Sequence, residues 1–272
     1  MSIRKNSLRI KNCNLNSKKS KTLITIITVV FNGERFIEDT ILSVINQTYQ
    51  NIEYIIIDGG SNDHTLDIIK KYDYGIDYWI SESDEGIYDA MNKGINFATG
   101  SWINFMNAGD IFCASNVLEK IVIYSDDIDI IFGDTLVFDS NRKKKIYCRA
   151  KKFNISNLLI WQTRTVCHQS MFVRADKIGI FSLDYKLKSE FNQYFLYLNL
   201  KSRNINATIC QYLTGGISEL DFKTETIETF KVILRNKPFL VWVSLPIILY
   251  RLYIFFKKKL YSLKFKLLFS DM

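Results

Sequence analysis

The sequence predicts an α/β domain with a doubly wound, mostly parallel central sheet flanked by helices, followed by a C-terminal helical extension that is apolar and basic. Three observations predict this fold class. β-Branched runs alternate with amphipathic segments over residues 24–106, which is the pattern of βαβ units. The 272 residues, 47% of them apolar, can bury one large core. Aspartates follow two of the runs, and ligands bind such sheets beyond the carboxyl ends of the strands.

The first half of the domain contains four predicted strands that alternate with helices. Apolar runs predict strands at Ile24–Phe31, Ile52–Ile57, Tyr78–Ile80 and Trp102–Met106. Apolar residues at helical spacing predict helices over Glu34–Gln47, Thr65–Tyr72 and Ile87–Ala98. Neither G-x-G-x-x-G after the first strand nor G-x-x-x-x-G-K-[ST] occurs, which argues against a Rossmann dehydrogenase and a P-loop enzyme.

The rest of the chain has a weaker pattern. We expect strands at Asp129–Phe132 and Thr135–Phe138, an exposed basic segment over residues 142–152, and a helix that starts near Ser189. Three regions result from the pattern and the charge. They are a basic, mobile arm over residues 1–21, a main domain over residues 22–222, and a helical tail over residues 223–272.

The positive charge of the chain lies at its two ends. Of the formal net charge of +8, residues 1–22 carry +7 and residues 223–272 carry +7, which leaves residues 23–222 at −6. A basic groove for nucleic acid would lie on the folded domain, so this distribution argues against a nucleic-acid partner. Basic ends on an acidic body suit anionic lipid headgroups better.

The tail contains an apolar segment, Phe239–Phe256, with one charge and Pro246 in its middle. About 20 apolar residues span a bilayer, so a single span is just within reach. We expect instead a helix that is broken at Pro246 and lies in the membrane interface; the alternative is an apolar helix packed on the core. Five widely spaced cysteines and the lack of an N-terminal apolar run favour a cytoplasmic protein on the inner face of the membrane.

Two aspartates follow predicted strands of the same sheet. Asp58 precedes Gly59 and Gly60, where its carboxylate is placed to accept hydrogen bonds from a nucleotide base or ribose; alternatively, it closes a turn. Asp110 ends the segment Asn107–Asp110. It is placed to hold Mg²⁺ or Mn²⁺ against a diphosphate, because hard cations prefer oxygen ligands. Alternatively, Asp110 caps the helix that follows.

Two further residues are candidates in the second half of the chain. Glu190 lies at the start of the helix near Ser189, where an ionised carboxylate can take a proton from a sugar hydroxyl. Alternatively, it is a first-turn residue that the helix dipole favours. His168 either faces the active site or satisfies hydrogen bonds in a polar loop. It has no partner at metal-ligand spacing, which favours the second role.

Taken together, these residues resemble the family 2 glycosyltransferases, which are nucleotide-sugar enzymes of the GT-A type. The matching segments occur in the family's order and spacing: Thr28–Gly33, Ser43–Tyr49, Glu53–Asp63 and Asp84–Gly94. Weaker similarity continues through Cys167–Gln169, Ser189–Phe191 and Gly215–Ser218, so the resemblance covers residues 22–220. Gly-Ile-Tyr-Asp-Ala-Met-Asn-Lys-Gly at positions 86–94 resembles a subgroup that builds bacterial surface polysaccharides.

The resemblance implies a role for each matching residue. The nucleotide-sugar site would be formed by Thr28, Val29, Phe31, Asp58, Asp84, Asn107 and Asp110. Phe31 would lie against the base, Asp110 would hold the divalent cation, and Glu190 stands where the family places its catalytic base. The donor-binding half would span about residues 22–112 and the acceptor half about residues 113–222.

The resemblance also implies an inverting displacement. An acceptor hydroxyl, deprotonated by Glu190, would attack the anomeric carbon as the nucleoside diphosphate leaves, through an oxocarbenium-like transition state. The partners would be a nucleotide sugar and a saccharide or lipid-linked acceptor of bacterial surface polysaccharide synthesis, met at the inner membrane surface through the tail.

The chain departs from the family at one position. Many relatives carry Asp-x-Asp-Asp where this chain has Asn107–Asp110, so the usual central metal ligand is missing at Gly109. Metal binding is therefore weak, recruits another residue, or is unnecessary. The same loss motivates an alternative of a different class, a catalytically silent nucleotide-sugar-binding partner of a polysaccharide-synthesis complex.

Overall fold

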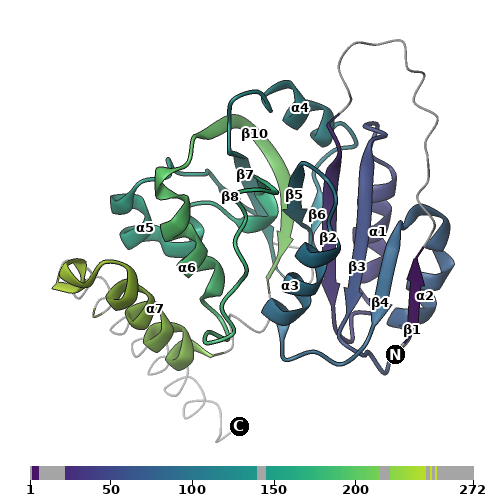
Figure 1. Cartoon of the computed structure of the whole chain (residues 1–272), viewed down its shortest axis with the longest axis horizontal. Helices are drawn as coiled ribbons and strands as arrows, with labels where there is room; N and C mark the ends of the chain where they lie inside the picture. Colours follow the sequence, from purple (N-terminus) through teal and green to yellow (C-terminus); the bar gives the residue numbers. More distant parts are fainter. Residues whose placement is uncertain are drawn as a thin grey trace, which may run out of the picture.

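The fold is described from a computed structural model of the chain. The structure describes residues 2–5, 22–139, 145–214 and 221–242, together with residues 246 and 249. In these ranges ten strands form one sheet with the order β1-β4-β3-β2-β5-β9-β7-β10-β6, and β8 lies beside β7. Helices cover both faces of the sheet (Figure 1).

Four parallel strands form the first half of the sheet, as the sequence predicts. They are β2 (Ile24–Val30), β3 (Ile52–Asp58), β4 (Tyr78–Ser81) and β5 (Trp102–Phe105). Side chains of β2 alternate between two cores: Ile24 and Ile26 face one, and Ile27 and Val29 face the other. Both faces are buried, which explains why these strands are continuous apolar runs.

Helices α1 (Ile37–Ile45), α2 (Thr65–Lys71) and α4 (Val117–Ile123) pack on one face, and α3 (Ile87–Phe97) packs on the other. Helix α1 begins three residues later and ends two residues earlier than the helix predicted over Glu34–Gln47. At its start, the carbonyl of Gly33 accepts hydrogen bonds from the N–H groups of Phe36 and Ile37. Residues 33–36 therefore form a turn before the helix, and the spacing of apolar residues cannot predict where such a turn ends.

The second half of the sheet is mixed. It contains β6 (Ile111–Phe112), β7 (Ile130–Phe138), β8 (Lys145–Cys148), β9 (Met171–Arg174) and β10 (Ser202–Leu213). Strand β7 runs parallel to β10 and antiparallel to β8 and β9, while β9 is antiparallel to β5. The mostly parallel arrangement therefore describes the first half of the sheet, and the whole sheet is mixed.

The two strands predicted around Gly133 are one strand, β7. Gly133 looks like a break in the sequence, but it sits where β7 passes closest to β10. A Cβ at this position would lie only 2.3 Å from the carbonyl oxygen of Ala207, so the glycine is needed for the close approach of the two strands. Of the basic segment expected to be exposed over residues 142–152, Lys145–Cys148 in β8 are exposed, and residues 142–144 lie outside the described residues.

The second half adds the helices α5 (Ile155–Trp161), α6 (Ser189–Leu196) and α7 (Phe222–Asn236). Short 3₁₀ turns complete the described elements: η1 (Asp73–Gly75) in the first half, and η2 (Gln162–Arg164), η3 (His168–Ser170), η4 (Tyr197–Asn199) and η6 (Pro238–Leu240) in the second. Ile103 of β5 pairs with Val173 of β9, and paired residues point to the same face. The core beneath α5–α7 therefore adjoins the core beneath α3. Helices α3 and α6 thus share one face of the sheet (Figure 1).

The first residues of the predicted mobile arm form a strand. β1 (Ser2–Lys5) pairs antiparallel with β4, Ser2 lying opposite Ser81 and Lys5 opposite Tyr78. The sequence pattern gave no sign of this pairing, but β4 would otherwise be a bare sheet edge, whose backbone groups readily pair with another strand. Residues 6–21 of the expected arm lie outside the described residues.

Helix α7 belongs to the folded domain, so the tail does not begin at residue 223. Val232 and Ile233 are completely buried in the second core. The buried carboxylate of Glu228 accepts hydrogen bonds from the N–H groups of Lys186 and Leu187, both at 2.8 Å.

The expected membrane segment Phe239–Phe256 lies mostly outside the described residues, with residues 239–242, 246 and 249 described. Within the described part of the chain, no helix has both the length and the apolar character needed to cross a bilayer.

Candidate active site

Four loops meet at the carboxyl ends of the parallel strands. The N–H of Gly59 donates to the carbonyl of Val30 (2.9 Å), and the N–H of Glu82 donates to the carbonyl of Asp58 (3.0 Å). These bonds carry the parallel order of the strands into the loops. Of the sequence-predicted donor residues, Phe31, Asp84, Asn107 and Asp110 lie on the loops at this edge, Asp58 ends β3, and Thr28 and Val29 lie within β2.

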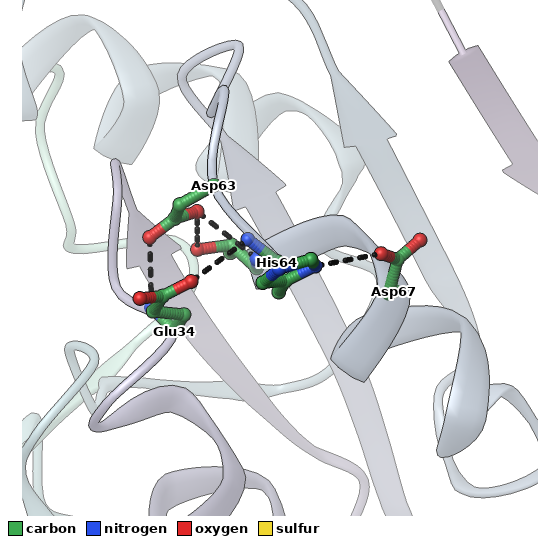
Figure 2. A network of polar contacts seen from close by, with 5 residues as sticks. Glu34, Asp63, His64 and Asp67 are labelled. Atoms are coloured by element: carbon green, nitrogen blue, oxygen red, sulfur yellow. Dashed lines mark hydrogen bonds and ion pairs between the residues drawn. The ribbon is translucent and has the colours of Figure 1, made fainter.

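The loops after β2 and β3 are fastened to each other. Figure 2 shows the N–H of Glu34 donating to Asp63 (3.1 Å), while the carboxylate of Glu34 accepts a hydrogen bond from the N–H of His64 (3.0 Å). Asp63 also binds the N–H of Thr65 at the start of α2 (3.0 Å). Because each loop supplies both donors and acceptors, neither loop can move without the other.

Phe31 is held by these loops in an exposed position. Its neighbour Asn32 has a positive φ of 50°, which asparagine tolerates better than most residues. Asn32 donates its N–H to the hydroxyl of Ser61 (2.7 Å) and accepts from the N–H of Asn62 (2.9 Å). The side chain of Phe31 remains 63% exposed, and a flat apolar group at a ligand-binding edge is suited to stacking.

Thr28 and Val29 lie inside the sheet. The Thr28 hydroxyl donates to the carbonyl of Met106 (2.8 Å) and shares a hydrogen bond with the hydroxyl of Tyr54 (3.0 Å). The carbonyl of Val29 accepts the N–H of Ala108 (3.2 Å). Both residues therefore hold β2 against its neighbours and the loop after β5.

Asp58 is completely buried and closes its own turn. Its carboxylate accepts hydrogen bonds from the N–H of Ser61 (3.1 Å), the hydroxyl of Ser61 (2.5 Å) and the hydroxyl of Ser81 (2.6 Å). The interpretation as a turn-closing residue is confirmed.

Asp84 lies directly against Gly59. A Cβ on Gly59 would lie 2.5 Å from Oδ2 of Asp84, so the glycine makes room for this carboxylate. Oδ1 accepts the N–H of Gly86 (2.9 Å). Burial raises the pKa of Asp84, with smaller increases from Asp89 and Asp58, although Gly86 and Lys93 act to lower it. A partly exposed carboxylate at the end of β4 is available to a ligand.

Asp110 is tied into the fold through both carboxylate oxygens. Its Oδ2 accepts from Nε2 of Gln169 (2.7 Å) and its Oδ1 accepts from the N–H of Leu213 (3.0 Å), and the residue is buried. In the described ranges, no three Asp, Glu, His or Cys side chains gather closely enough to hold an ion by themselves. The divalent cation that we expected at Asp110 therefore stays a prediction.

Asp110 fastens its loop to distant parts of the sheet. Gln169 comes from η3, and Leu213 comes from the end of β10. The alternative role as a helix cap is wrong, because Asp110 leads into β6 and α4 begins only at Val117, after Asn116.

Glu190 lies in the first turn of α6, as expected, and faces residues from three other elements. Its Oε2 accepts a hydrogen bond from the hydroxyl of Tyr88 on α3. Glu190 and His168 line the same small cavity, and the charge of Glu190 acts on the pKa of His168. His168 Nε2 lies 3.2 Å from Nδ2 of Asn107, in the loop after β5. One polar cluster thus joins the donor-side loop to the second half of the domain.

We call these four residues the polar cluster: Tyr88, Asn107, His168 and Glu190. Oδ1 of Asn107 is buried and has no hydrogen-bond partner among the described residues, so the amide can accept from a bound hydroxyl. The cluster offers an ionisable carboxylate, a histidine and an amide at the rim of the sheet. Such a set can remove a proton from a hydroxyl and hold the oxygen that loses it.

Sequence reasoning gave Tyr88 no role of its own, and for His168 it favoured a polar-loop role over a position facing the active site. Tyr88 lies within the segment 86–94, but its partner is 102 residues away in the chain. One signal was present: Tyr88 and Asn92 are polar residues four apart on the buried face of α3. Polar groups at that spacing on an apolar face indicate a contact with another element.

The histidine gives a pH prediction. Burial lowers the pKa of His168, and the charge of Glu190 only partly opposes this. The unfolded chain takes up this proton near pH 6.5, whereas the folded chain resists it. His168 therefore contributes fully to stability above that pH, and the contribution is lost as the pH falls below it.

Urea denaturation at pH 7.5 and pH 5.5 checks this expectation. The wild type should lose more unfolding free energy on acidification than His168→Gln does. The other histidine, His64, is exposed and supplies the control, because His64→Gln should follow the wild type. Equal pH dependence of the wild type and His168→Gln would rule the idea out.

Comparison with known proteins places this geometry among sugar-transferring enzymes. The family profile described as "Glycosyl transferase family 2" matches residues 25–181. A PGL/p-HBAD biosynthesis glycosyltransferase of Mycobacterium bovis is 27% identical over 209 residues, which cover 72% of this chain and 79% of that protein. An uncharacterized glycosyltransferase of Mycobacterium tuberculosis is 30% identical over 210 residues, covering 73% and 78%.

Solved structures share the fold. TarS residues 1–349 of S. aureus, in complex with UDP-GlcNAc, aligns with a TM-score of 0.63 at 15% identity, covering 82% of this chain and 66% of that one. The mannosyltransferase PcManGT of Pyrobaculum calidifontis, in complex with GDP-Man and Mn²⁺, aligns with a TM-score of 0.55 at 12% identity, covering 80% and 63%. This chain thus spans just under two thirds of the length of these solved chains.

Proposed function

The chain belongs to glycosyl transferase family 2 and is a nucleotide-sugar-dependent glycosyltransferase. We propose that it transfers the sugar to a saccharide or lipid-linked acceptor with inversion of the configuration at the anomeric carbon. The observation that carries this proposal is the position of Glu190. Its carboxylate lies at the start of α6 and accepts a hydrogen bond from Tyr88 of α3. It shares a small cavity with His168, which contacts Asn107 in the loop after β5. A carboxylate at the border between the two halves can serve a hydroxyl that approaches the donor.

The donor lies along the edge of the parallel strands in this proposal. Phe31 stacks on the base, because it is exposed beside a rigid pair of loops. Asp84 and Asn107 line the ribose and the sugar diphosphate, while Asp58 acts by holding the turn over residues 59–61. Thr28 and Val29 shape the floor through the sheet. The solved neighbours bind UDP-GlcNAc and GDP-Man at the same fold, which supports a nucleoside diphosphate sugar as donor.

The reaction is a single displacement. Glu190 takes the proton of the acceptor hydroxyl, the oxygen forms a bond to the anomeric carbon, and the bond from that carbon to the diphosphate oxygen breaks with its electron pair. Glu190 supplies the proton acceptor for this step. Asp110 fixes the loop that contains Asn107.

Activity on a panel of nucleotide sugars tests the proposal. The purified full chain is incubated with each donor and with bacterial membrane extract as the source of acceptor, and released nucleoside diphosphate is measured. At least one donor should be consumed, with its sugar recovered in the acceptor fraction. Calorimetric binding of a donor without consumption, across a broad set of acceptors, would favour the silent binding partner that the change at Gly109 suggests.

We also propose that the domain meets the cytoplasmic face of the membrane through a surface near its C-terminal end. Phe239 and Trp242 are 90% and 79% exposed, although Val241 between them is buried in the second core with Leu158 of α5. The core contact fixes the segment so that the two aromatic side chains point outward.

The neighbouring helix extends this surface with the same residue types. Ile160 and Trp161 of α5 are exposed, and Nζ of Lys151 lies 5.0 Å from the centre of the Trp161 ring. Aromatic rings beside lysines are typical of proteins that lie in the bilayer interface. An acceptor carried by a lipid would then be presented close to the domain.

Vesicle flotation tests the membrane surface. Phe239→Ser and Trp242→Ser together should lower binding to vesicles with anionic phosphatidylglycerol about tenfold or more, and binding should fall with salt. Tyr74→Ser is the matched control, because Tyr74 is an exposed aromatic residue on η1, away from this surface. Unchanged flotation of the double variant would contradict the proposal.

A further inference from the structure

We propose that Tyr88 is a positioning residue for the catalytic base: its hydroxyl holds Oε2 of Glu190, so that Oε1 is directed to the acceptor hydroxyl. The inference rests on the proposed function, because it takes Glu190 as the base. The inference also gives the segment 86–94 a role of its own, because Tyr88 in this segment would fix the position of the base relative to the donor.

The contact joins two helices from different halves of the domain. Tyr88 lies in the first turn of α3, is 5% exposed, and donates its hydroxyl hydrogen to Oε2 of Glu190 in the first turn of α6. Oε1 of Glu190 makes no hydrogen bond to any of the described residues. One carboxylate oxygen is thus fixed and the other remains available to substrate.

The hydroxyl of Tyr88 also lies close to the start of α6, where the backbone groups of Ser189 and Glu190 act to lower its pKa. The residue before them, Lys188, provides no side-chain cap for the helix. The phenol therefore contacts α6 at its first turn.

The phenol stays protonated and so remains a donor. Burial raises the pKa of Tyr88 well above its usual value, and the charge of Glu190 raises it further. The backbone groups of Ser189 and Glu190 lower the pKa only in part. The direction of the Tyr88–Glu190 hydrogen bond is therefore fixed, with the carboxylate as acceptor.

The aromatic ring of Tyr88 is held in place by packing against another ring. It stacks on Phe181 with ring centres 5.6 Å apart, and Phe181 packs edge-on against Phe105 of β5. The backbone of Phe181 is held in turn by Asn92, whose side chain donates to its carbonyl (2.9 Å) and accepts from its N–H (2.8 Å). Tyr88 and Asn92, one turn apart on α3, thus hold the second half of the domain at two points.

The hydroxyl of Tyr88 differs from those of two other buried tyrosines, Tyr54 and Tyr194, in its hydrogen-bond partner. Tyr54 shares its hydroxyl with Thr28, and Tyr194 donates to the carbonyl of Val166; both partners are neutral and structural. Tyr88 alone among these three is bonded to the carboxylate of the proposed base. A phenylalanine would preserve the ring packing of Tyr88, so the hydroxyl can be removed on its own.

Tyr88→Phe is the first test. We expect kcat for sugar transfer to fall about 10- to 100-fold, because an unfixed carboxylate reaches the productive geometry less often. The donor KM and the calorimetric Kd for the nucleoside diphosphate should stay within about twofold, because Asp84 and Phe31 are not touched. A nucleoside diphosphate that binds normally also reports that the variant is folded.

Tyr72→Phe is the matched control. Tyr72 is a buried tyrosine whose hydroxyl donates to a glutamate, Glu38, but this pair lies between α1 and α2 on the other face of the sheet. Its removal changes the same kind of hydrogen bond without reaching the polar cluster. We expect kcat of Tyr72→Phe to remain within about twofold of the wild type.

A double-variant cycle separates positioning from general loosening. Glu190→Asp keeps the charge but withdraws the carboxylate from Tyr88 by one methylene group. If Tyr88 acts through Glu190, Tyr88→Phe should lower kcat in the wild type but change it less than about twofold in the Glu190→Asp background. A purely structural role would multiply the two losses.

The outcomes are distinguishable from failure of the proposed function. If Glu190→Gln remains fully active, Glu190 is not the base and both proposals fall. If Glu190→Gln is inactive but Tyr88→Phe keeps wild-type kcat, or its loss multiplies with Glu190→Asp, only the role of Tyr88 is overturned. A fall in kcat that vanishes in the Glu190→Asp background supports positioning.

Discussion

Replacing Glu190 by glutamine should lower kcat for sugar transfer by about 10²- to 10⁴-fold, the usual contribution of a general base. The amide has the size of the carboxylate and its oxygen can still accept the hydrogen bond of Tyr88. The fold and the donor site should therefore persist while the acceptor hydroxyl loses its base. The expected result is a loss in kcat at nearly constant donor Kd.

Steady-state kinetics of sugar transfer measure kcat, and calorimetry on the same preparation measures the donor Kd. Glu119→Gln is the control, because Glu119 is an exposed glutamate on α4, away from the polar cluster. It should match the wild type in both measurements. Transfer by Glu190→Gln within threefold of the wild type would remove Glu190 from the chemistry.

Replacing Glu228 by alanine should lower the free energy of unfolding by about 3 kcal/mol. The Glu228 carboxylate is buried and accepts two backbone N–H groups ahead of α6, and each buried donor left without a partner costs about 1–3 kcal/mol. The same bonds fix Lys186 and Leu187, which lead into the helix that carries Glu190. We therefore expect activity to fall together with stability.

Urea unfolding followed by circular dichroism measures the change. Lys231→Ala, at an exposed position one turn further along α7, should stay within about 0.5 kcal/mol of the wild type. If Glu228→Ala were equally harmless, α7 would be a loosely attached tail, as the charge pattern suggested, instead of a part of the domain.

The first half of the fold could be predicted because its physics is local. Ile24–Val30 and Ile52–Asp58 are buried on both faces, so an apolar run is enough to identify each strand. Helix α3 shows its buried face through the i, i+3, i+7 spacing of Tyr88, Met91 and Ile95. The parallel order then follows from the alternation of strands and helices.

Much of the second half, β10 above all, escaped prediction because its strands depend on remote partners. β10 has only two buried residues, Ile209 and Cys210, among polar neighbours, and its pairing with β7 and β6 joins segments far apart in the chain. Such a strand has no apolar pattern of its own. The mixed order of the sheet therefore could not be derived from local periodicity.

The place of a candidate residue in the chain was easier to predict than its contacts. Glu190 lies in the first turn of α6, as the sequence predicts. Asp110 accepts hydrogen bonds from Gln169 and the N–H of Leu213, and neither partner is near it in sequence. The link from Tyr88 to Glu190 is likewise visible only once α3 and α6 share a face.

The stereochemistry of the product tests the single displacement most directly. Once a donor has been identified, the anomeric configuration of the first product is read from its one-bond carbon–hydrogen coupling by nuclear magnetic resonance. A hydroxyl activated by Glu190 and attacking opposite the departing diphosphate must give the inverted anomer. Retention of the donor configuration would contradict this account, because it would require a second step or a nucleophile on the opposite face of the sugar.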